Sequence, residues 1–236
     1  MKLMARAWAD GLDFIGTNIH RPKNVKAGRV GFGDMICEVS NLCQAPYFNQ
    51  GGTILVPDLH SAFNVFVSML PCNMDKWTWE VNRSKFNKIK VQTKDWDSQN
   101  SLRTILHCHT EYDDYIKLDK NKFKKCEVLV DTDTEYATIQ RKAFSKKCQY
   151  NDNHIKKMED KYGMKIIEIG GHEKLGPEKC AYILDKAKLH IGIDSGMSHF
   201  ALTVKDKQDV HIHVPKDRIT SATYRWIDKG YNVTLI

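Results

Sequence analysis

The stretch IGIDSGMSHFALTV, residues 191–204, is the strongest indication of the fold in this sequence. It continues an apolar run, LHIGID at 189–194, which is typical of a buried strand. Small and polar residues then form a turn at 194–196, and the apolar spacing that follows predicts a helix beginning near Met197 or Ser198. Strand, tight turn and helix are the parts of a βα unit in a parallel sheet.

This turn has the chemistry of an anion site. The carboxyl end of a parallel strand beside a helix N-terminus is where α/β proteins bind phosphates. Exposed amide groups and the helix dipole attract negative charge, and Gly196 lets a ligand approach the backbone closely. The residues alone are equally compatible with an anion site and with an ordinary βα turn.

The same rhythm of strands and helices extends through the C-terminal half. Apolar and alternating runs predict strands at 126–131, 164–171, 189–194 and 209–215. Apolar spacing predicts helices at 152–162 and 177–187, the first ending at Gly163 and the second beginning with Pro177. Residues 216–236 stay unassigned, with a helix at 219–229 that crosses back to the N-terminal lobe as the hypothesis for them. We therefore expect a parallel α/β lobe over residues 123–236.

The N-terminal half repeats this organisation in a shorter form. Strands are predicted at 25–30, 53–57, 88–92 and 103–109, and helices at 35–44 and 63–70. The polar, charged stretch 113–125 is the best candidate for a linker, which gives an N-terminal lobe at 1–122. Residues 1–24 stay unassigned.

Composition excludes several classes of protein. The chain has 236 residues, 42% hydrophobic and 28% charged, with no apolar run long enough to span a bilayer and no secretory signal in its first ten residues. Its seven cysteines are odd in number and never spaced as C-x-x-C. This pattern favours reduced thiols and a cytoplasmic location.

The formal net charge of +7 leaves two interpretations open. A lysine-rich surface can be no more than solvated charge. It can also serve a polyanionic partner, because basic side chains gain affinity by displacing the counterions of phosphates.

The turn also resembles the D-(S/T)-G-x-x-H-x-A pattern of the bacterial heptosyltransferase family, glycosyltransferase family nine. Asp194, Ser195, Gly196, His199 and Ala201 match it. The resemblance implies an α/β fold of the GT-B type, with two Rossmann-like lobes, a cleft between them and a reduced N-terminal lobe. It also implies that the turn holds the diphosphate of a nucleotide-sugar donor.

A second motif lies in the N-terminal half. Gly33-Asp34-Met35-Ile36 resembles the family's G-D-(V/I/L)-(L/I/V) motif. In the family this aspartate is the general base that deprotonates the acceptor hydroxyl, so the resemblance implies the catalytic role for Asp34. The alternative for Asp34 is the N-cap of a helix.

The donor site implied by the resemblance includes one substitution. The family places a Lys-x-W-P lysine on the donor phosphates, whereas this chain has DTDTEYATIQRKAF at 131–144, where Arg141 or Lys142 can replace it. Glu168 is the nearest acidic candidate for the nucleotide ribose. The implied donor-binding residues are Gly33, Arg141, Lys142, Glu168, Gly170, Gly171, Asp194, Ser195, Gly196, Ser198 and His199.

No metal or other cofactor is expected. GT-B enzymes of this kind generally need no metal for catalysis, and the nucleotide sugar is a co-substrate. The pairs His107/His109 and His211/His213 have the alternation of metal ligands on a strand, but cysteine and acidic partners are missing nearby in sequence. We therefore expect no zinc site.

Candidate acceptor-binding residues lie in the N-terminal half. Trp77 and Trp79 alternate as on a strand, and basic residues follow them. The indoles either stack on sugars or bases or pack in the core. The candidates are Trp77, Trp79, Lys85, Lys88 and Lys90.

Three functions remain open. A compact, basic relative of this family suits the glycosylation of hydroxylated bases in bacteriophage DNA, in the host cytoplasm. A lipopolysaccharide or other glycan acceptor is the second possibility, and a non-catalytic nucleotide or nucleotide-sugar binding protein is the third. The sequence does not identify the sugar, the donor base or the oligomeric state.

Overall fold

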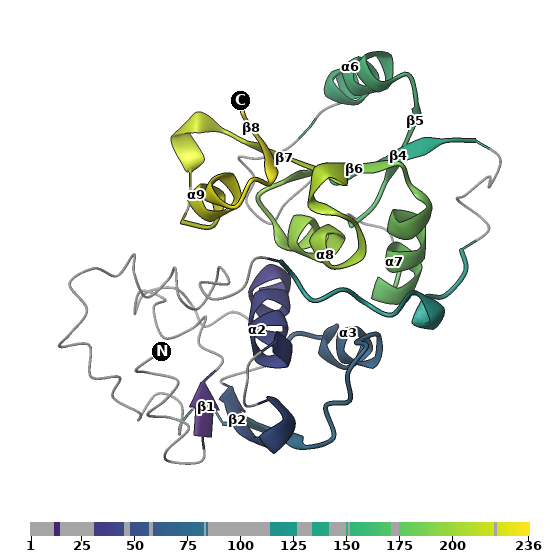
Figure 1. Cartoon of the computed structure of the whole chain (residues 1–236). Helices are drawn as coiled ribbons and strands as arrows, with labels where there is room; N and C mark the ends of the chain where they lie inside the picture. Colours follow the sequence, from purple (N-terminus) through teal and green to yellow (C-terminus); the bar gives the residue numbers. More distant parts are fainter. Residues whose placement is uncertain are drawn as a thin grey trace. The chain divides into compact units, whose positions relative to one another are not determined.

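The computed structural model describes residues 12–14, 31–44, 48–56, 59–82, 84, 114–126, 134–141, 150, 152–170, 175–219 and 221–236 (Figure 1). The chain divides into two compact units. The first comprises residues 1–63 and 72–116, and the second comprises residues 64–71 and 117–236. Each unit is described by itself. The lobe boundary expected between residues 122 and 123 stays a prediction.

The first unit contains a parallel sheet in the order β1-β2-β3. Its strands are β1 (Leu12–Phe14), β2 (Gly52–Val56) and β3 (Trp77–Val81), and the 3-10 helix η1 (Phe48–Gln50) precedes β2. Strand β2 confirms the prediction at 53–57, and β1 lies in a stretch that was left unassigned. The strands expected at 25–30, 88–92 and 103–109 lie outside the described residues.

Helix α2 (Phe32–Gln44) is the helix predicted at 35–44, begun three residues earlier. It forms because apolar residues recur on one side: Ile36, Val39 and Leu42 are all buried. The first intrahelical bond runs from the Met35 amide to the Gly31 carbonyl at 3.1 Å. Asp34 is therefore the third residue of the helix, and the N-cap alternative for it is wrong.

The second unit is built on one parallel sheet, in the order β5-β4-β6-β7-β8. Its strands are β4 (Tyr136–Ile139), β5 (Lys165–Glu168), β6 (Leu189–Ile193), β7 (Val210–Val214) and β8 (Asn232–Leu235). Its longer helices are α6 (Asp152–Tyr162), α7 (Pro177–Lys186), α8 (Gly196–Val204) and α9 (Ser221–Asp228). This confirms an α/β fold with a parallel, Rossmann-like sheet.

The remaining described elements are short. They are α3 (Phe63–Ser68), which confirms the first part of the helix predicted at 63–70, and the 3-10 helices η2 (Lys120–Lys122), η3 (Lys207–Asp209) and η4 (Lys216–Arg218). The described part of the expected linker, residues 114–125, has η2 as its regular structure.

Two strands of the second unit escaped the sequence prediction. Strand β4 is a run of four buried residues, YATI, inside the stretch 131–144, where no strand was predicted beyond residue 131. The prediction placed a strand at 126–131 instead, but Cys126 is not in a strand, and residues 127–131 lie outside the described part. Strand β8 was missed because it is half exposed at the edge of the described sheet. The helices predicted at 152–162, 177–187 and 219–229 are confirmed within two residues.

The strand order reverses direction at β4. From β4 the chain moves to β5 on one side, then returns past β4 to β6 on the other side. Helix α6 accordingly covers one face of the sheet, and α7, α8 and α9 cover the opposite face (Figure 1). In open α/β sheets, ligands bind outside the carboxyl ends of the strands at such a reversal. Here those ends are residues 140–141 and 194–196.

Helix α8 packs very closely on β6, the strand that precedes it. Gly192 faces this helix, and a side chain there would overlap the Ser198 hydroxyl and come within 3.0 Å of the His190 ring. Ser198 Oγ donates a hydrogen bond to the Ile193 carbonyl at 2.6 Å. The absence of a side chain at 192 thus determines how near the start of α8 lies to the sheet.

Gly192→Ala should lower the free energy of unfolding by about 1–3 kcal/mol, because it overpacks this contact. Ser198→Ala removes one hydrogen bond and should cost about 1 kcal/mol. The double variant should be more stable than the sum of the two losses predicts, because the second change removes the overlapping atom. Urea unfolding followed by circular dichroism measures all three, and strict additivity would contradict this account of the packing.

Candidate functional site

The turn after β6 leaves the start of α8 without a side-chain cap. Ser195 is in the N-cap position with an extended backbone, yet its side chain makes no capping hydrogen bond to the helix. Its hydroxyl donates instead to the side-chain oxygen of Gln140. Serine at this position usually accepts a bond from the amides of the first turn. Here that acceptor is directed toward the end of β4.

The amides at the start of α8 are therefore available for a ligand. The Ser198 and His199 amides donate to the Ser195 carbonyl at 3.1 and 3.3 Å. Gly196 and Met197 precede these bonds, and their amides have no hydrogen-bond partner within the described part of the chain. Unpaired N–H groups and the positive end of the dipole make this a place for an anion.

Helix α9, which is close to the C-terminal end of the sequence, contacts the turn at Asp194 and the start of α8 at His199. The buried Thr223 hydroxyl donates to Asp194 Oδ2 at 3.4 Å. The Trp226 ring lies 4.8 Å from the His199 ring, centroid to centroid, at 48°. Sequence reasoning left 216–236 without a role. Thr223 and Trp226 are three residues apart and therefore lie on one side of the predicted helix. This spacing was a signal that one side of the helix packs against another part of the protein.

Strand β4 ends at the site with two polar residues. Gln140 is buried, and its backbone amide donates a hydrogen bond to the Ile191 carbonyl at 2.9 Å. Arg141 Nε lies 3.4 Å from Glu168 Oε2, at the end of β5, and both side chains are mostly covered. Gln140 was missed because no strand was predicted to end beside it. A polar residue directly after the short run YATI, which is rich in strand-forming residues, was the signal that could have identified it.

Gly170, two residues after the end of β5, also approaches the start of α8. Gly170 has φ +72°, and a side chain there would overlap the side chain of Met197. A glycine at this position therefore permits both the left-handed turn and the close approach. The structure brings together the ends of β4, β5 and β6, with Arg141, Glu168, Gly170 and the turn 194–196.

Two predicted donor-binding residues lie in the core. Ser198 is fully buried and bonded to Ile193, and His199 is 8% exposed against Trp226. Their side chains hold α8 in place. A direct contact between either residue and a donor stays a prediction.

The remaining predicted site residues lie in the first unit or outside the described residues. Gly33 lies in α2 of the first unit and is buried, whereas the side chain of Asp34 is outside the described part. Lys142, Gly171, Lys85, Lys88 and Lys90 also lie outside it.

The sheet beneath the site carries no charged histidine. His190 is fully buried with its Nδ1 3.0 Å from Thr138 Oγ1, and burial lowers the pKa of His190 to about 3. The lowered pKa of His190 favours a neutral ring, so the positive features identified at the turn in the described part of the chain are the start of α8 and Arg141.

The His211/His213 pair lies on β7 among aromatic side chains. His211 Nδ1 is 3.0 Å from the Tyr162 hydroxyl, and the His213 ring packs edge-on against Tyr150 at 5.9 Å between centroids. Burial lowers the pKa of His213 to about 4. Among the described residues, no group of three or more histidine, cysteine or acidic side chains is arranged to hold a metal. His107 and His109 lie outside those residues.

The two tryptophans of β3 have different surroundings. Trp77 is 5% exposed, and its Nε1 donates to the Phe48 carbonyl at 2.9 Å. Trp77 is therefore buried, as expected if this indole packs in the core. Trp79 is half-buried, with its ring edge-on to Phe63 at 4.5 Å between centroids. An acceptor contact for either indole stays a prediction.

No helix within the described ranges is long and apolar enough to cross a membrane.

Comparison with known proteins identifies the fold. No protein-family model and no curated protein matches the sequence. Two solved structures are similar: the bacterial iron-containing dodecameric glycosyltransferase TibC from enterotoxigenic E. coli H10407, and the dodecameric iron-containing heptosyltransferase TibC in complex with ADP-D-β-D-heptose. Each has a TM-score of 0.50 and 11% identity, over 80% and 79% of this chain. The chain spans 56% of the length of either TibC chain, and it shares with them a mixed α/β fold that is known from glycosyltransferases.

Proposed function

We propose that this chain is a glycosyltransferase that uses a nucleotide-sugar donor and binds the donor diphosphate at the start of α8. One observation carries the proposal: α8 begins without a side-chain cap at the point where the strand order reverses. The first amides of the helix, its dipole and the absence of a side chain at Gly196 together suit a diphosphate.

Neighbouring groups support this assignment. The Asp194 carboxylate accepts a hydrogen bond from Thr223, which draws one of its oxygens toward α9. Arg141 supplies a guanidinium with five N–H donors, one of which lies beside Glu168. We assign Arg141 to the donor phosphates and Glu168 to the nucleotide ribose.

The donor class is supported by the fold and by the turn together. The D-S-G-x-x-H-x-A pattern, the strand order and the likeness to a heptosyltransferase described with ADP-D-β-D-heptose agree on a nucleoside diphosphate sugar. The sugar and the base are left open in this proposal.

Asp34 is the proposed general base. Asp34 belongs to the Gly33-Asp34-Met35-Ile36 motif and is the third residue of α2. An ionised carboxylate can remove the proton of an acceptor hydroxyl.

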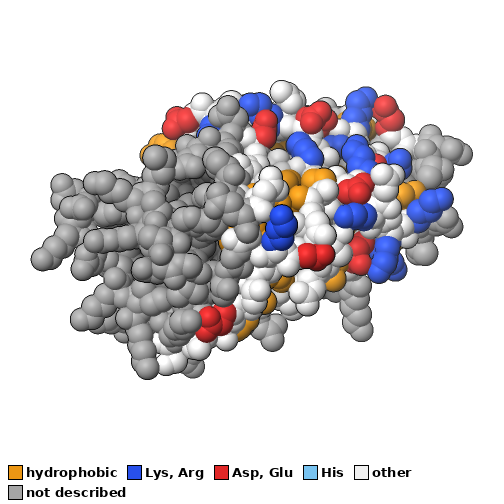
Figure 2. Space-filling model, turned by 60° about the horizontal axis from the view of Figure 1, so that its bottom comes forward, with side chains coloured by type: hydrophobic (Ala, Val, Ile, Leu, Met, Phe, Trp, Pro, Cys, Tyr) orange, Lys and Arg blue, Asp and Glu red, His pale blue; other side chains and the backbone are white. Residues whose placement is uncertain are grey.

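The acceptor that we propose is a hydroxylated base in DNA, with a lipopolysaccharide or other glycan as the alternative. The proposal rests on the net charge of +7 and on Lys85, Lys88 and Lys90. Figure 2 shows lysine and acidic side chains interspersed over the described residues of one face. Among the described residues, Lys120 pairs with Asp185 at 2.6 Å and Lys124 pairs with Glu178 at 2.8 Å. DNA contact therefore depends on the lysines that follow β3.

The donor site is tested with Gly196→Asp, which adds a carboxylate to the first turn of α8. Binding of nucleoside diphosphate sugars should weaken about tenfold or more, because like charge and a side chain then meet the diphosphate. Isothermal titration calorimetry with a panel that includes ADP-D-β-D-heptose measures the loss. Gln208→Asp is the matched control, since it adds the same charge in η3, which directly precedes β7 and so lies at the amino ends of the strands, away from the turn at 194–196. Equal affinities in the two variants would place the site elsewhere.

The general base is tested with Asp34→Asn. Sugar transfer should fall by a factor on the order of 10² to 10⁴, because the amide accepts no proton. Donor affinity should stay unchanged, and stability should fall by no more than about 1 kcal/mol, the value of one charge at a helix N-terminus. Full transfer activity in the variant would remove Asp34 from the mechanism. If the wild-type protein binds the donor but transfers no sugar, the result would favour the alternative of a non-catalytic nucleotide-sugar binding protein.

The acceptor is tested by the salt dependence of DNA binding. Replacing Lys85, Lys88 and Lys90 together by Gln should flatten the slope of log K against log salt by roughly one unit per lost phosphate contact. Filter binding with and without hydroxymethylated bases measures it. A wild-type protein without salt-dependent affinity for DNA would leave the glycan acceptor as the better assignment.

A further inference from the structure

Three sulfur atoms from separate parts of the sequence converge in the first unit. Cys43 lies at the end of α2, and Cys72 and Met74 lie in the turn that leads to β3. The Sγ atoms of Cys43 and Cys72 are 3.4 Å apart. Cys43 Sγ is 3.7 Å from Met74 Sδ. We call these three residues the sulfur cluster.

The spacing of the sulfur cluster suits a single small ion. Sulfur ligands about 2.3 Å from a metal in a trigonal plane lie about 4 Å from one another. The Cys43–Cys72 and Cys43–Met74 sulfur distances of 3.4 and 3.7 Å are both shorter than this, so an outward movement of the side chains would admit the ion.

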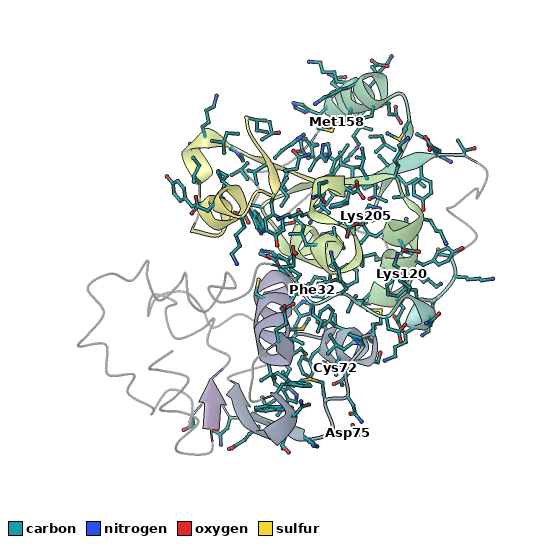
Figure 3. The ribbon with its side chains drawn as sticks, in the orientation of Figure 1. Phe32, Cys72, Asp75, Lys120, Met158 and Lys205 are labelled. Carbon is teal, nitrogen blue, oxygen red and sulfur yellow. The ribbon has the colours of Figure 1, made fainter. Side chains whose placement is uncertain are left out.

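The main chain around the sulfur cluster is held in place without a metal. Asn73 Oδ1 accepts a bond from the Asp75 amide at 2.7 Å, and the Trp77 amide donates to the Met74 carbonyl at 2.8 Å. Figure 3 labels Cys72 and Asp75 in this turn. Met74 is buried, whereas Cys43 and Cys72 are half-buried and within reach of an ion from solvent.

The ligand types select the metal. Thiolate and thioether sulfur are soft ligands that favour Cu(I), whereas magnesium, calcium and manganese require oxygen. A thioether binds without losing a proton. Each thiol must lose one, so binding releases two protons and leaves two thiolates, one thioether and one Cu(I) with a net charge of −1.

We propose that Cys43, Cys72 and Met74 bind one Cu(I) ion, which joins the end of α2 to the turn before β3. The ion is no part of the donor site, whose proposed phosphate ligands belong to the second unit. No change in oxidation state is involved.

The test uses the full chain, kept reduced and free of oxygen, and titrates Cu(I) against a coloured Cu(I) chelator. The wild-type protein should retain one equivalent of Cu(I) more than the Cys43→Ser variant or the Cys72→Ser variant retains. Met74→Leu keeps the volume and removes the sulfur, so its affinity at this site should fall about tenfold or more. Copper X-ray absorption should show a shell of sulfur atoms.

Cys180→Ser is the matched control. Cys180 is a buried thiol of the second unit, beside the Leu175 carbonyl at 3.9 Å, and a serine hydroxyl can replace its weak bond. This variant should bind copper as the wild-type protein does. Thermal melting without copper establishes that every variant is folded.

The proposal is overturned if the wild-type protein retains no more copper than the two serine variants, or if nitrogen and oxygen dominate the copper shell. Equal affinity in the wild-type protein and Met74→Leu would remove the thioether from the site.

Discussion

The close approach of α8 to strand β6 is the constraint on which the second unit depends. Gly192 has no side chain to hold the helix away, and the Ser198 hydroxyl bonds to the Ile193 carbonyl at the bottom of the first turn. Strand β6 is buried along its whole length, so its position in the sheet is fixed, and the contacts at Gly192 and Ser198 then fix where α8 begins. The amides of Gly196 and Met197 are thereby presented at the carboxyl end of the sheet, where the strand order reverses. A longer side chain at 192 would move these groups and the proposed phosphate site with them.

Ser195 shows how a helix end can be left open for a ligand. A serine in this position would ordinarily stabilise the helix by about 1 kcal/mol. Here its hydroxyl bonds to Gln140 and ties the ends of β4 and β6 together. The stability that α8 forgoes at its first turn is offset by the contacts of Ser198, His199 and Phe200 inside the unit. A bound diphosphate would supply the missing acceptor.

The sequence was sufficient for the elements with strong periodicity and for the turn itself. Helix α6 was predicted with the bounds that the structure has, because its apolar spacing ends at a glycine. Strand β6 followed from a largely apolar run, LHIGI, and β7 from an alternating one, VHIHV. Strand β4 was missed because four buried residues between charged neighbours give too short a signal. Local signals could have marked Gln140 and Thr223 as candidates, but the residues that they contact depend on which strands and helices are neighbours, and a local pattern does not contain that information. The start of α2 was predicted three residues too late, because the cap is Gly31, which has no side chain to mark it.

The strand order β5-β4-β6-β7-β8 also has a consequence for synthesis on the ribosome. The chain emerges with its N-terminal residues first, so β4 appears before the other four strands. Each later strand then pairs with one that already exists: β5 and β6 with β4, β7 with β6, and β8 with β7. None of these strands has to wait for a partner that is still to be translated. The sheet can therefore grow outward from its centre as the polypeptide lengthens, and each newly paired strand covers an edge that would otherwise be open to pairing with another nascent chain.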